Sequence, residues 1–283
     1  MNQEEMEVKK IAIIGAGSIA EALISGMVDH HFIDRRNIWI TNRSDSLKLE
    51  KLQGEFQINT TYDLFDLMTG ADIVILTMKP KDAGSAIEMI KPFLTEKMLM
   101  VSVLAGVSLQ TIEELAERPL AIIRAMPNTS AAIGKSATAL AYNTHSTLEQ
   151  VECVKKMFDT IGLTRFVEEA QLDAVTGLSG SGPAYFYYLV EAMEKSAVEI
   201  GLEPKLAKEL IVQTLLGTAE MLTKSQKPSY QLRREVTSPG GTTEAGIRVL
   251  EQYNVQEAFI TCIIEATNQS KKLGTEFKST LPH

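Results

Sequence analysis

The segment Ser238–Gly246, "SPGGTTEAG", combines three glycines and three hydroxyl side chains with a single ionisable group, Glu244. Pro239 ends the element before it, the glycines expose backbone amides, and a new helix is expected to begin near Thr242. Amides at a helix N-terminus bind anions, and a charge-assisted hydrogen bond contributes about 1.5 to 3 kcal/mol. Such a segment can therefore hold an anion; taken alone, the simpler interpretation is a capped turn that binds nothing.

A second glycine-rich turn lies near the N-terminus, in "IAIIGAGSIAEAL". Gly15, Gly17 and Ala20 form a G-x-G-x-x-A arrangement after an apolar strand and at the start of a helix. The first glycine permits the tight turn, the second lets a pyrophosphate approach the backbone, and the small third residue lets the helix pack closely. We expect a dinucleotide to bind here, against the amides of Ser18 and Ile19. The alternative is a glycine turn with a structural role alone.

The next expected strand, "NIWIT", runs into Asn42, Arg43 and Ser44. An Asp or Glu at this place would bind the ribose 2'-hydroxyl of NAD, whereas a guanidinium can pair with the 2'-phosphate of NADP. We therefore expect NADPH as the cofactor, with NADH as a second option. Because surface arginines are common, the alternative is that Arg43 is simply solvated.

Three further strand ends should face the same crevice, because ligands of an open parallel sheet bind beyond the carboxyl ends of its strands. They are "TMKP", "SVLAGV" and "RAMPNT", which begin at Thr77, Ser102 and Arg124. Lys79 is expected to meet a cofactor phosphate or ribose, and residues 103–105 to offer a surface for the nicotinamide. The candidate cofactor contacts in these segments are Met78, Lys79, Pro80, Val103, Leu104, Ala105 and Asn128.

The first half of the chain alternates short apolar runs with amphipathic segments, as parallel strands joined by crossover helices do. The runs are too apolar for half-exposed strands, which indicates a mostly parallel sheet covered on both faces. After about Ala170 helical spacing replaces this pattern. We expect an α/β domain over residues 1–168 and an all-helical domain over residues 169–283. The expected strands are "KIAII", "NIWIT", "DIVILTM", "MLMVSV", "AIIRAM", "SATALAY" and "TRFV".

The composition excludes several classes of protein. A net charge of −8 without a basic cluster argues against nucleic-acid binding. The acidic start "MNQEEMEVKK" and the lack of an apolar run of about 18 residues predict a cytoplasmic protein that does not span a membrane. Cys153 and Cys262 lie in apolar helical patterns, so we expect buried thiols and no metal site. The helices after residue 170 are apolar on wide faces, so the expected partners are a small-molecule substrate and further copies of the chain, as a homodimer or larger homo-oligomer.

The segment "GLSGSGPAYFYYLV" places Gly177, Gly180 and Gly182 in the spacing G-x-x-G-x-G. It resembles the active-site segment of the β-hydroxyacid dehydrogenases, in which a catalytic lysine and then an asparagine follow. Phe186 and Val190 occupy those positions here, and neither side chain can take a proton from a hydroxyl. Reduction of an imine does not need such a proton-transferring side chain, because the imine nitrogen can already carry its proton when the hydride arrives.

The segment "EVTSPGGTTEAGIRVLE" closely resembles the C-terminal signature of the pyrroline-5-carboxylate reductases. The motifs "GAGSIAEAL", "MKP", "SVLAGV", "RAMPNT" and "GLSGSGPAY" also occur in that family's order and spacing, so the resemblance covers nearly the whole chain. It implies a Rossmann-like NADP-binding domain over residues 1–168, a helical dimerisation and substrate-binding domain over residues 169–283, and an active site near the dimer interface. The implied reaction is the NAD(P)H-dependent reduction of 1-pyrroline-5-carboxylate to L-proline, the last step of proline biosynthesis.

Carried over by position, the resemblance assigns the substrate loop to Ser238, Gly240, Gly241, Thr242 and Thr243. Thr243 is the residue implied to act in catalysis, with its hydroxyl at the ring nitrogen while hydride reaches the imine carbon. Three alternatives remain open at this point: a reductase of another small cyclic imine, an oxidoreductase similar to the β-hydroxyacid dehydrogenases, and an NADP-binding protein without catalytic activity.

Overall fold

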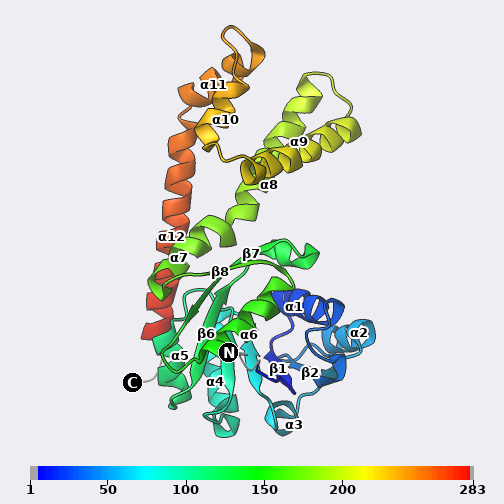
Figure 1. Ribbon diagram of the computed structural model, residues 1–283, viewed down its shortest axis with the longest axis vertical. Helices are drawn as coiled ribbons and strands as arrows, with labels where there is room; N and C mark the ends of the chain where they lie inside the picture. Colours follow the sequence, from blue (N-terminus) through cyan, green and yellow to red (C-terminus); the bar gives the residue numbers. More distant parts are fainter. Residues whose placement is uncertain (1–5, 281–283) are drawn as a thin grey trace. The chain divides into compact units, whose positions relative to one another are not determined.

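The computed structural model describes residues 6–280, and its centre is an eight-stranded sheet with the order β3-β2-β1-β4-β5-β6-β7-β8 (Figure 1). Every neighbouring pair is parallel except β6 and β7, which are antiparallel. The strands are β1 (Ile11–Ile14), β2 (Ile38–Thr41), β3 (Asn59–Thr60), β4 (Ile73–Leu76), β5 (Leu99–Ser102), β6 (Ala121–Met126), β7 (Ser136–Tyr142) and β8 (Gly162–Phe166). The predicted α/β fold with a mostly parallel sheet is confirmed.

Helices cover the sheet on both faces, which is why its central strands are apolar on both sides. In β1, Ile11 and Ile13 pack into one core layer with α1, α2 and α6, while Ala12 and Ile14 pack into the other with α3, α4 and α5. These helices are α1 (Ser18–Asp29), α2 (Ser46–Phe56), α3 (Leu64–Met68), α4 (Ala83–Ile90), α5 (Leu109–Ala116) and α6 (Leu148–Asp159). Both layers hold the strand ends, and the loops that follow them, in fixed positions.

Two details of the sheet differ from the sequence-based expectation. β3 was not expected, because a two-residue edge strand is too short to show a period. β7 runs against β6, because only the short turn η4 (Thr129–Ile133) separates them, and a parallel connection needs a longer crossover. The other short turns are η1 (Arg35–Asn37), η2 (Pro80–Asp82), η3 (Lys91–Phe93), η5 (Glu169–Gln171) and the π-helical turn η6 (Thr176–Gly180).

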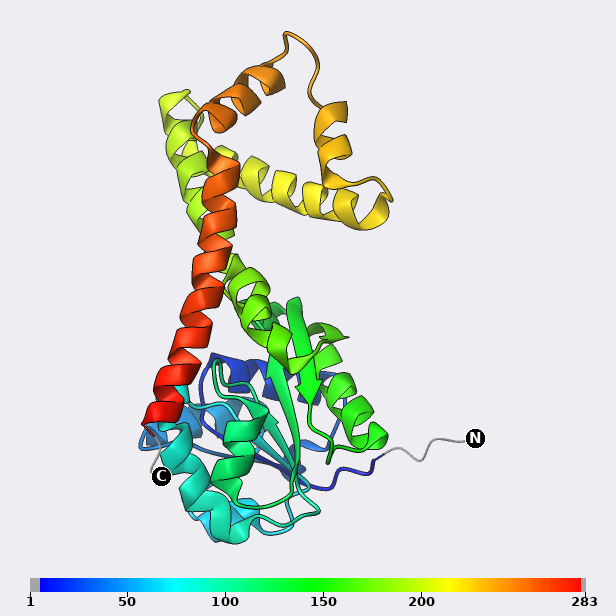
Figure 2. The same cartoon turned by 90° about the vertical axis from the view of Figure 1, so that its left-hand side faces the viewer.

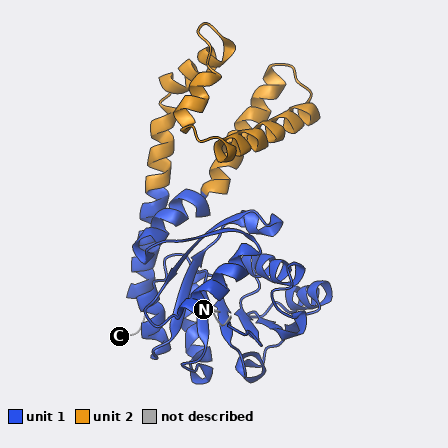
Figure 3. Cartoon of the chain, viewed as in Figure 1, with its two compact units in different colours: residues 1–181, 265–283 blue, residues 182–264 orange. Residues whose placement is uncertain are grey.

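The chain divides into two compact units, residues 1–181 with 265–283, and residues 182–264 (Figure 3). The first unit contains the sheet, α7 (Leu172–Val175) and the C-terminal part of α12 (Val255–Ser279), a continuous helix that the two units share (Figure 2). The hydroxyl of Ser270 in α12 donates to Oδ1 of Asp173 in α7 at 2.6 Å. The domain boundary expected between residues 168 and 169 stays a prediction.

The second unit is all-helical, as predicted, and few of its side chains are buried within one chain. It contains α8 (Gly182–Glu199), α9 (Pro204–Lys224), α10 (Ser229–Glu235), α11 (Thr242–Gln252) and the start of α12. α10 and α11 have no buried residue, and Tyr188 in α8 is 74% exposed. Cys153 in the first unit is buried, but Cys262 is exposed in the single chain, so the expected burial was wrong for Cys262. Among residues 6–280, no helix is both long and apolar enough to cross a membrane.

Candidate active site

The turn from β1 into α1 has the backbone that its glycines predict. Gly15 has φ +109°, in the region that favours glycine, and its amide donates to the carbonyl of Thr41 at 2.9 Å. A Cβ on Gly15 would lie 2.7 Å from the amide nitrogen of Met78 and 2.8 Å from Oγ1 of Thr77. Thr77 locks the turn, because its hydroxyl donates to the Gly15 carbonyl at 2.9 Å. The first glycine is therefore required by the neighbouring strand end.

The N-terminus of α1 leaves its amides available to a ligand. Gly17 is the N-cap residue, with φ −81° and ψ −176°, and no side chain caps the helix. A Cβ on Gly17 would meet nothing within 4 Å, whereas Ala20 is completely buried against the core. Ser18, Ile19 and Ala20 thus begin a helix whose dipole and amides face open space beside Gly17.

Glu21 is the acidic residue in the first turn of α1, and two lysines of α2 neutralise its charge. Lys48 hydrogen bonds to Glu21, and Lys51 Nζ lies 3.2 Å from its Oε1. The hydrogen bond from Lys48 is the main cause that lowers the pKa of the Glu21 carboxyl. Because these lysines offset its charge, Glu21 opposes an anion at the helix N-terminus less than a lone carboxylate would.

The end of β2 carries the three residues predicted to surround a ribose phosphate. Asn42 is held in place, because its Oδ1 accepts from the Asp45 amide at 2.9 Å and from the Tyr62 hydroxyl at 3.1 Å. Arg43 is 89% exposed, and its only ion pair among residues 6–280 is a loose one, 3.8 Å to Oδ1 of Asp82. Ser44 is exposed. A phosphate could therefore pair with the Arg43 guanidinium without breaking a buried contact.

The loops after β4 and β5 differ in how much side chain they present. Met78 and Pro80 are half-buried and Lys79 is exposed at the start of η2. Val103 and Ala105 are half-buried, but the side chain of Leu104 is only 2% exposed and belongs to the core. Leu104 can therefore meet a ligand only through its backbone.

Asn128 uses both ends of its amide to hold the protein together. Its Oδ1 accepts from the Ser130 amide at 3.1 Å, and its Nδ2 donates to the Ser179 carbonyl at 3.0 Å. The sequence placed Asn128 among the cofactor contacts, but its side chain joins the turn after β6 to the π-helical turn η6. Gly180 in η6 lies close to the same place, because a Cβ there would be 3.1 Å from Cε of Met126.

In the second unit, the predicted substrate loop forms an open helix start. Gly240 has φ +73°, and Gly241 is the N-cap residue of α11 with φ −85°, ψ 171° and no side-chain cap. Glu244 folds back on the loop, because its Oε2 accepts from the Gly240 amide at 2.8 Å. Ser238, Thr242 and Thr243 are exposed, and within residues 6–280 none of their hydroxyls has a hydrogen-bond partner. The Gly241 amide also donates within the loop, to the Ser238 carbonyl at 3.0 Å, so the groups left for a ligand are the first amides of α11, the helix dipole and the free hydroxyls.

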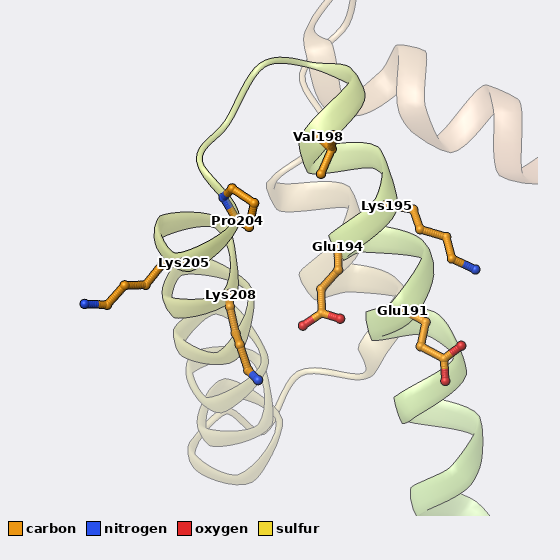
Figure 4. A pocket seen from close by; sticks show the side chains of 7 residues that line it. All are labelled: Glu191, Glu194, Lys195, Val198, Pro204, Lys205 and Lys208. Atoms are coloured by element: carbon orange, nitrogen blue, oxygen red, sulfur yellow. The ribbon is translucent and has the colours of Figure 1, made fainter.

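Two grooves in the second unit are lined by none of the residues predicted to be functional. A groove of about 400 Å³ beside the loop brings basic side chains near it; its lining residues are Arg233, Arg234, Thr237, Glu244, Ile247, Arg248 and Glu251. A groove of about 620 Å³ between α8 and α9 is lined by Glu191, Glu194, Lys195, Val198, Pro204, Lys205 and Lys208 (Figure 4). In the described part of the chain, no group of three or more His, Cys, Asp or Glu side chains is placed to hold a metal ion.

The sequence did not predict one polar contact near the site, the ion pair between the buried Arg124 and the half-buried Glu169. Arg124 is 7% exposed, and its NH1 lies 3.0 Å from Oε1 of Glu169, which also accepts from the Leu109 amide at 2.6 Å. The one available signal was a charged residue inside the apolar run "AIIRAM". The partner residue gave no signal.

The strand order and the glycine turn define a dinucleotide-binding α/β fold with an added helical unit. Residues 10–106 match a family model described as NADP oxidoreductase coenzyme F420-dependent, and residues 169–273 match one described as pyrroline-5-carboxylate reductase dimerisation. Pyrroline-5-carboxylate reductase 2 of Bacillus subtilis is 45% identical over 95% of this chain and 96% of its own length. The chain belongs to the pyrroline-5-carboxylate reductase family.

Solved structures agree with this assignment. A pyrroline-5-carboxylate reductase from Coxiella burnetii matches with 36% identity and a TM-score of 0.86, over 94% of this chain and 99% of that one. The Plasmodium falciparum pyrroline carboxylate reductase, solved with NADP bound, matches with 29% identity and a TM-score of 0.87, over 95% and 99% of the two chains.

Proposed function

We propose that this protein reduces 1-pyrroline-5-carboxylate to L-proline with NADPH. The observation that carries the proposal is the start of α11, an uncapped helix N-terminus with the free hydroxyls of Thr242 and Thr243, in a chain whose relatives are named for this reaction. Such a site can hold a carboxylate and a ring nitrogen without an ionisable side chain. The predicted roles of Ser238, Gly240, Gly241, Thr242 and Thr243 stay part of this proposal.

The residues after β1 and β2 fit the nicotinamide cofactor. The open space at Gly17 and the uncapped amides of Ser18, Ile19 and Ala20 suit a pyrophosphate, and the exposed Arg43 suits a 2'-phosphate. Lys79, in the loop after β4, adds a second exposed positive charge. This set of residues favours NADPH over NADH.

The chain's own groups bind and orient the substrate. The first amides of α11 donate hydrogen bonds to the substrate carboxylate, where the helix dipole favours negative charge. The Thr243 hydroxyl holds the ring nitrogen and so fixes which face of the ring is presented. When bound, NADPH supplies the hydride that adds to the C=N carbon. The nitrogen brings its own proton as an iminium, so no side chain has to act as a general acid.

The second unit is proposed to be the dimer interface. Its helices expose large apolar side chains that one chain leaves uncovered, such as Tyr187 at 63% and Leu216 at 56% exposure. The matching family model is described as a dimerisation domain. Burial of these faces in a second copy of the chain would complete the core that a single chain lacks. The cytoplasmic location stays a prediction, which cell fractionation with an activity assay would test.

A direct assay tests the reaction. NADPH oxidation should require 1-pyrroline-5-carboxylate and should yield one L-proline for each NADPH consumed. Because the carboxylate contact contributes about 1.5 to 3 kcal/mol, 1-pyrroline without the carboxylate should react about 10- to 100-fold more slowly. A folded, NADPH-binding preparation without turnover would refute the proposal, and equal rates with both imines would favour a general cyclic imine reductase.

The cofactor preference has its own test in Arg43→Ala. The variant should lower kcat/KM for NADPH about tenfold and leave that for NADH unchanged, because only NADPH carries the 2'-phosphate. Steady-state kinetics with both cofactors measures the ratio. An unchanged ratio would show that Arg43 is merely a solvated side chain.

A further inference from the structure

The loop between β5 and α5 touches the C-terminal part of α12 backbone to backbone. Gly106 has φ +74°, and a Cβ on it would lie 3.0 Å from the amide nitrogen of Gly274 in α12. A Cβ on Gly274 would lie only 2.5 Å from the carbonyl oxygen of Gly106. Real Cβ atoms do not approach a backbone oxygen so closely, so Gly274 has no room for a side chain. At Gly106 a side chain would be tightly packed and strained by the positive φ. The two glycines set how near α12 stands to this loop.

Other contacts within the first unit fix this part of α12, so the helix cannot simply move away. Ser270, one turn before Gly274, is 4% exposed and donates to Oδ1 of Asp173 at 2.6 Å. Phe277, just beyond Gly274, packs against the core layer that contains Leu104 and Val107. A side chain at residue 274 would therefore push the loop rather than the helix.

The far side of the same loop is held by the ion pair of Arg124 and Glu169. Arg124 reaches the Leu104 carbonyl with NH2 at 3.5 Å, and Glu169 binds both Arg124 and the Leu109 amide. Leu104 and Val107 anchor the loop by burial, at 2% and 0% exposure. The loop is thus fixed at both ends, and between them the backbone of Gly106 contacts α12.

The position of this loop in the sheet gives it a specific task under the proposed function. β1 lies between β2 and β4, so the residues predicted for the adenosine ribose follow β2, on one side of the glycine turn. The β4 and β5 loops lie on the other side, where the nicotinamide half of a dinucleotide extends. Residues 103–105 are therefore the surface against which the ring would rest.

We propose that Gly274 is a positioning residue for hydride transfer, which sets through Gly106 the height of the loop 103–105 under the nicotinamide. The inference rests on the proposed function. Gly274 does not itself touch the cofactor. A methyl group at residue 274 would displace the loop 103–105, and so change the distance between the nicotinamide and the carbon that accepts the hydride. Errors of about 1 Å in that geometry can cost about 100-fold in rate.

The test compares Gly274→Ala with Gly54→Ala. Gly54 lies in α2, where a Cβ meets nothing within 4 Å, so it is a matched glycine in an α-helix without the contact. For Gly274→Ala we expect kcat to fall about tenfold or more. The Kd of NADPH should rise, while the Kd of ADP-ribose 2'-phosphate, which lacks the nicotinamide, should stay unchanged. Gly54→Ala should leave kcat and both Kd values at wild-type levels.

The two Kd values separate positioning from general damage. Equal weakening of NADPH and ADP-ribose 2'-phosphate, or unchanged kcat and Kd values, would overturn the proposal. Ser270→Ala supplies a second variant without steric conflict: it removes the hydrogen bond to Asp173, and we expect the same pattern with about a threefold fall in kcat. If the wild-type protein does not reduce 1-pyrroline-5-carboxylate, the proposed function fails, yet the contrast between the two Kd values still shows whether Gly274 acts on the nicotinamide half.

Discussion

The protein contains two helix N-termini of nearly the same local design, at α1 and at α11. Each begins with an N-cap glycine in extended conformation, Gly17 with φ −81° and Gly241 with φ −85°, and neither has a side-chain cap. A glycine with positive φ precedes each helix, and a glutamate lies in the first turn of each. By local chemistry alone, both are candidate anion sites.

They differ in what supports them. Gly15 before α1 is enclosed by the end of β4, and Ala20 in the first turn is completely buried. A Cβ on Gly240 before α11 would meet nothing within 4 Å, and α11 has no buried residue in the single chain. The first site is built by the sheet of one chain. The second is held by the hydrogen bond from the Gly240 amide to Glu244, and its helix is not packed against a core in the single chain.

The two helix starts therefore obtain their precise geometry from different sources. A turn fixed by a packed sheet can be ready before its ligand arrives, which suits a cofactor that every turnover uses. A helix start in a unit with exposed apolar faces becomes rigid when a partner covers those faces. We therefore expect cofactor binding to tolerate loss of the dimer better than substrate turnover does.

The largest effect is expected for Gly15→Ala, compared with Gly240→Ala. Both positions have positive φ, but only at Gly15 would the new methyl collide with backbone, 2.7 Å from the Met78 amide nitrogen. Gly15→Ala should cost about 3 kcal/mol or more of unfolding free energy and abolish NADPH binding, and Gly240→Ala about 1 kcal/mol with NADPH binding intact. Denaturant unfolding and NADPH titration measure both, and equal losses would remove the contrast between the two turns.

Thr243→Ala is expected to lower kcat/KM for 1-pyrroline-5-carboxylate about 100-fold, because one hydrogen bond to the reacting group is lost. The Kd of NADPH should stay unchanged, since its predicted contacts lie at α1 and the strand ends. Thr243→Ser keeps the hydroxyl and should retain most activity. If kcat/KM and NADPH affinity fell by the same factor, Thr243 would serve the fold and not the reaction.

Gly17→Ala should weaken NADPH binding about tenfold, because the methyl group occupies the space in which a pyrophosphate approaches the amides. The melting temperature should not fall, since φ is −81° and a Cβ meets no atom within 4 Å. Calorimetric titration and thermal unfolding give the two quantities. Wild-type affinity in this variant would mean that the open space at Gly17 does not hold the phosphates.

The smallest effect is expected for Lys48→Met, which removes the main hydrogen bond to Glu21. The pKa of the Glu21 carboxyl is lowered in the folded protein from its ordinary value of 4.5. The pair therefore stabilises the fold at pH values above 4.5, and this contribution is lost as the pH falls through the lowered pKa. The variant should lose at most about 1 kcal/mol near neutral pH. The difference from wild type should shrink in acid, and a constant difference across the pH series would exclude this linkage.

The local backbone geometry of the candidate site was predictable from sequence, whereas the directions of its side chains were not. The glycine turn, the second signature and the exposed Arg43 lie where their motifs predicted them, because positive φ and helix starts depend on a few adjacent residues. The predicted cofactor contacts of Asn128 and Leu104 stay predictions, but the sequence did not show that the Asn128 amide links two turns or that the Leu104 side chain is buried. A motif marks a segment, whereas the direction of each side chain depends on its neighbours in space.

Residue patterns along the chain were enough to locate most strands and helices, the turns that need glycine, and the family to which the chain belongs. They did not show that Gly274 contacts Gly106, that Arg124 pairs with Glu169, or that β7 runs antiparallel to β6; these contacts are visible in the folded structure. The physical reason is that local conformation follows from sterics and hydrogen bonding within a few residues. Contacts between distant segments follow from how the core packs, and neither spacing nor composition encodes that.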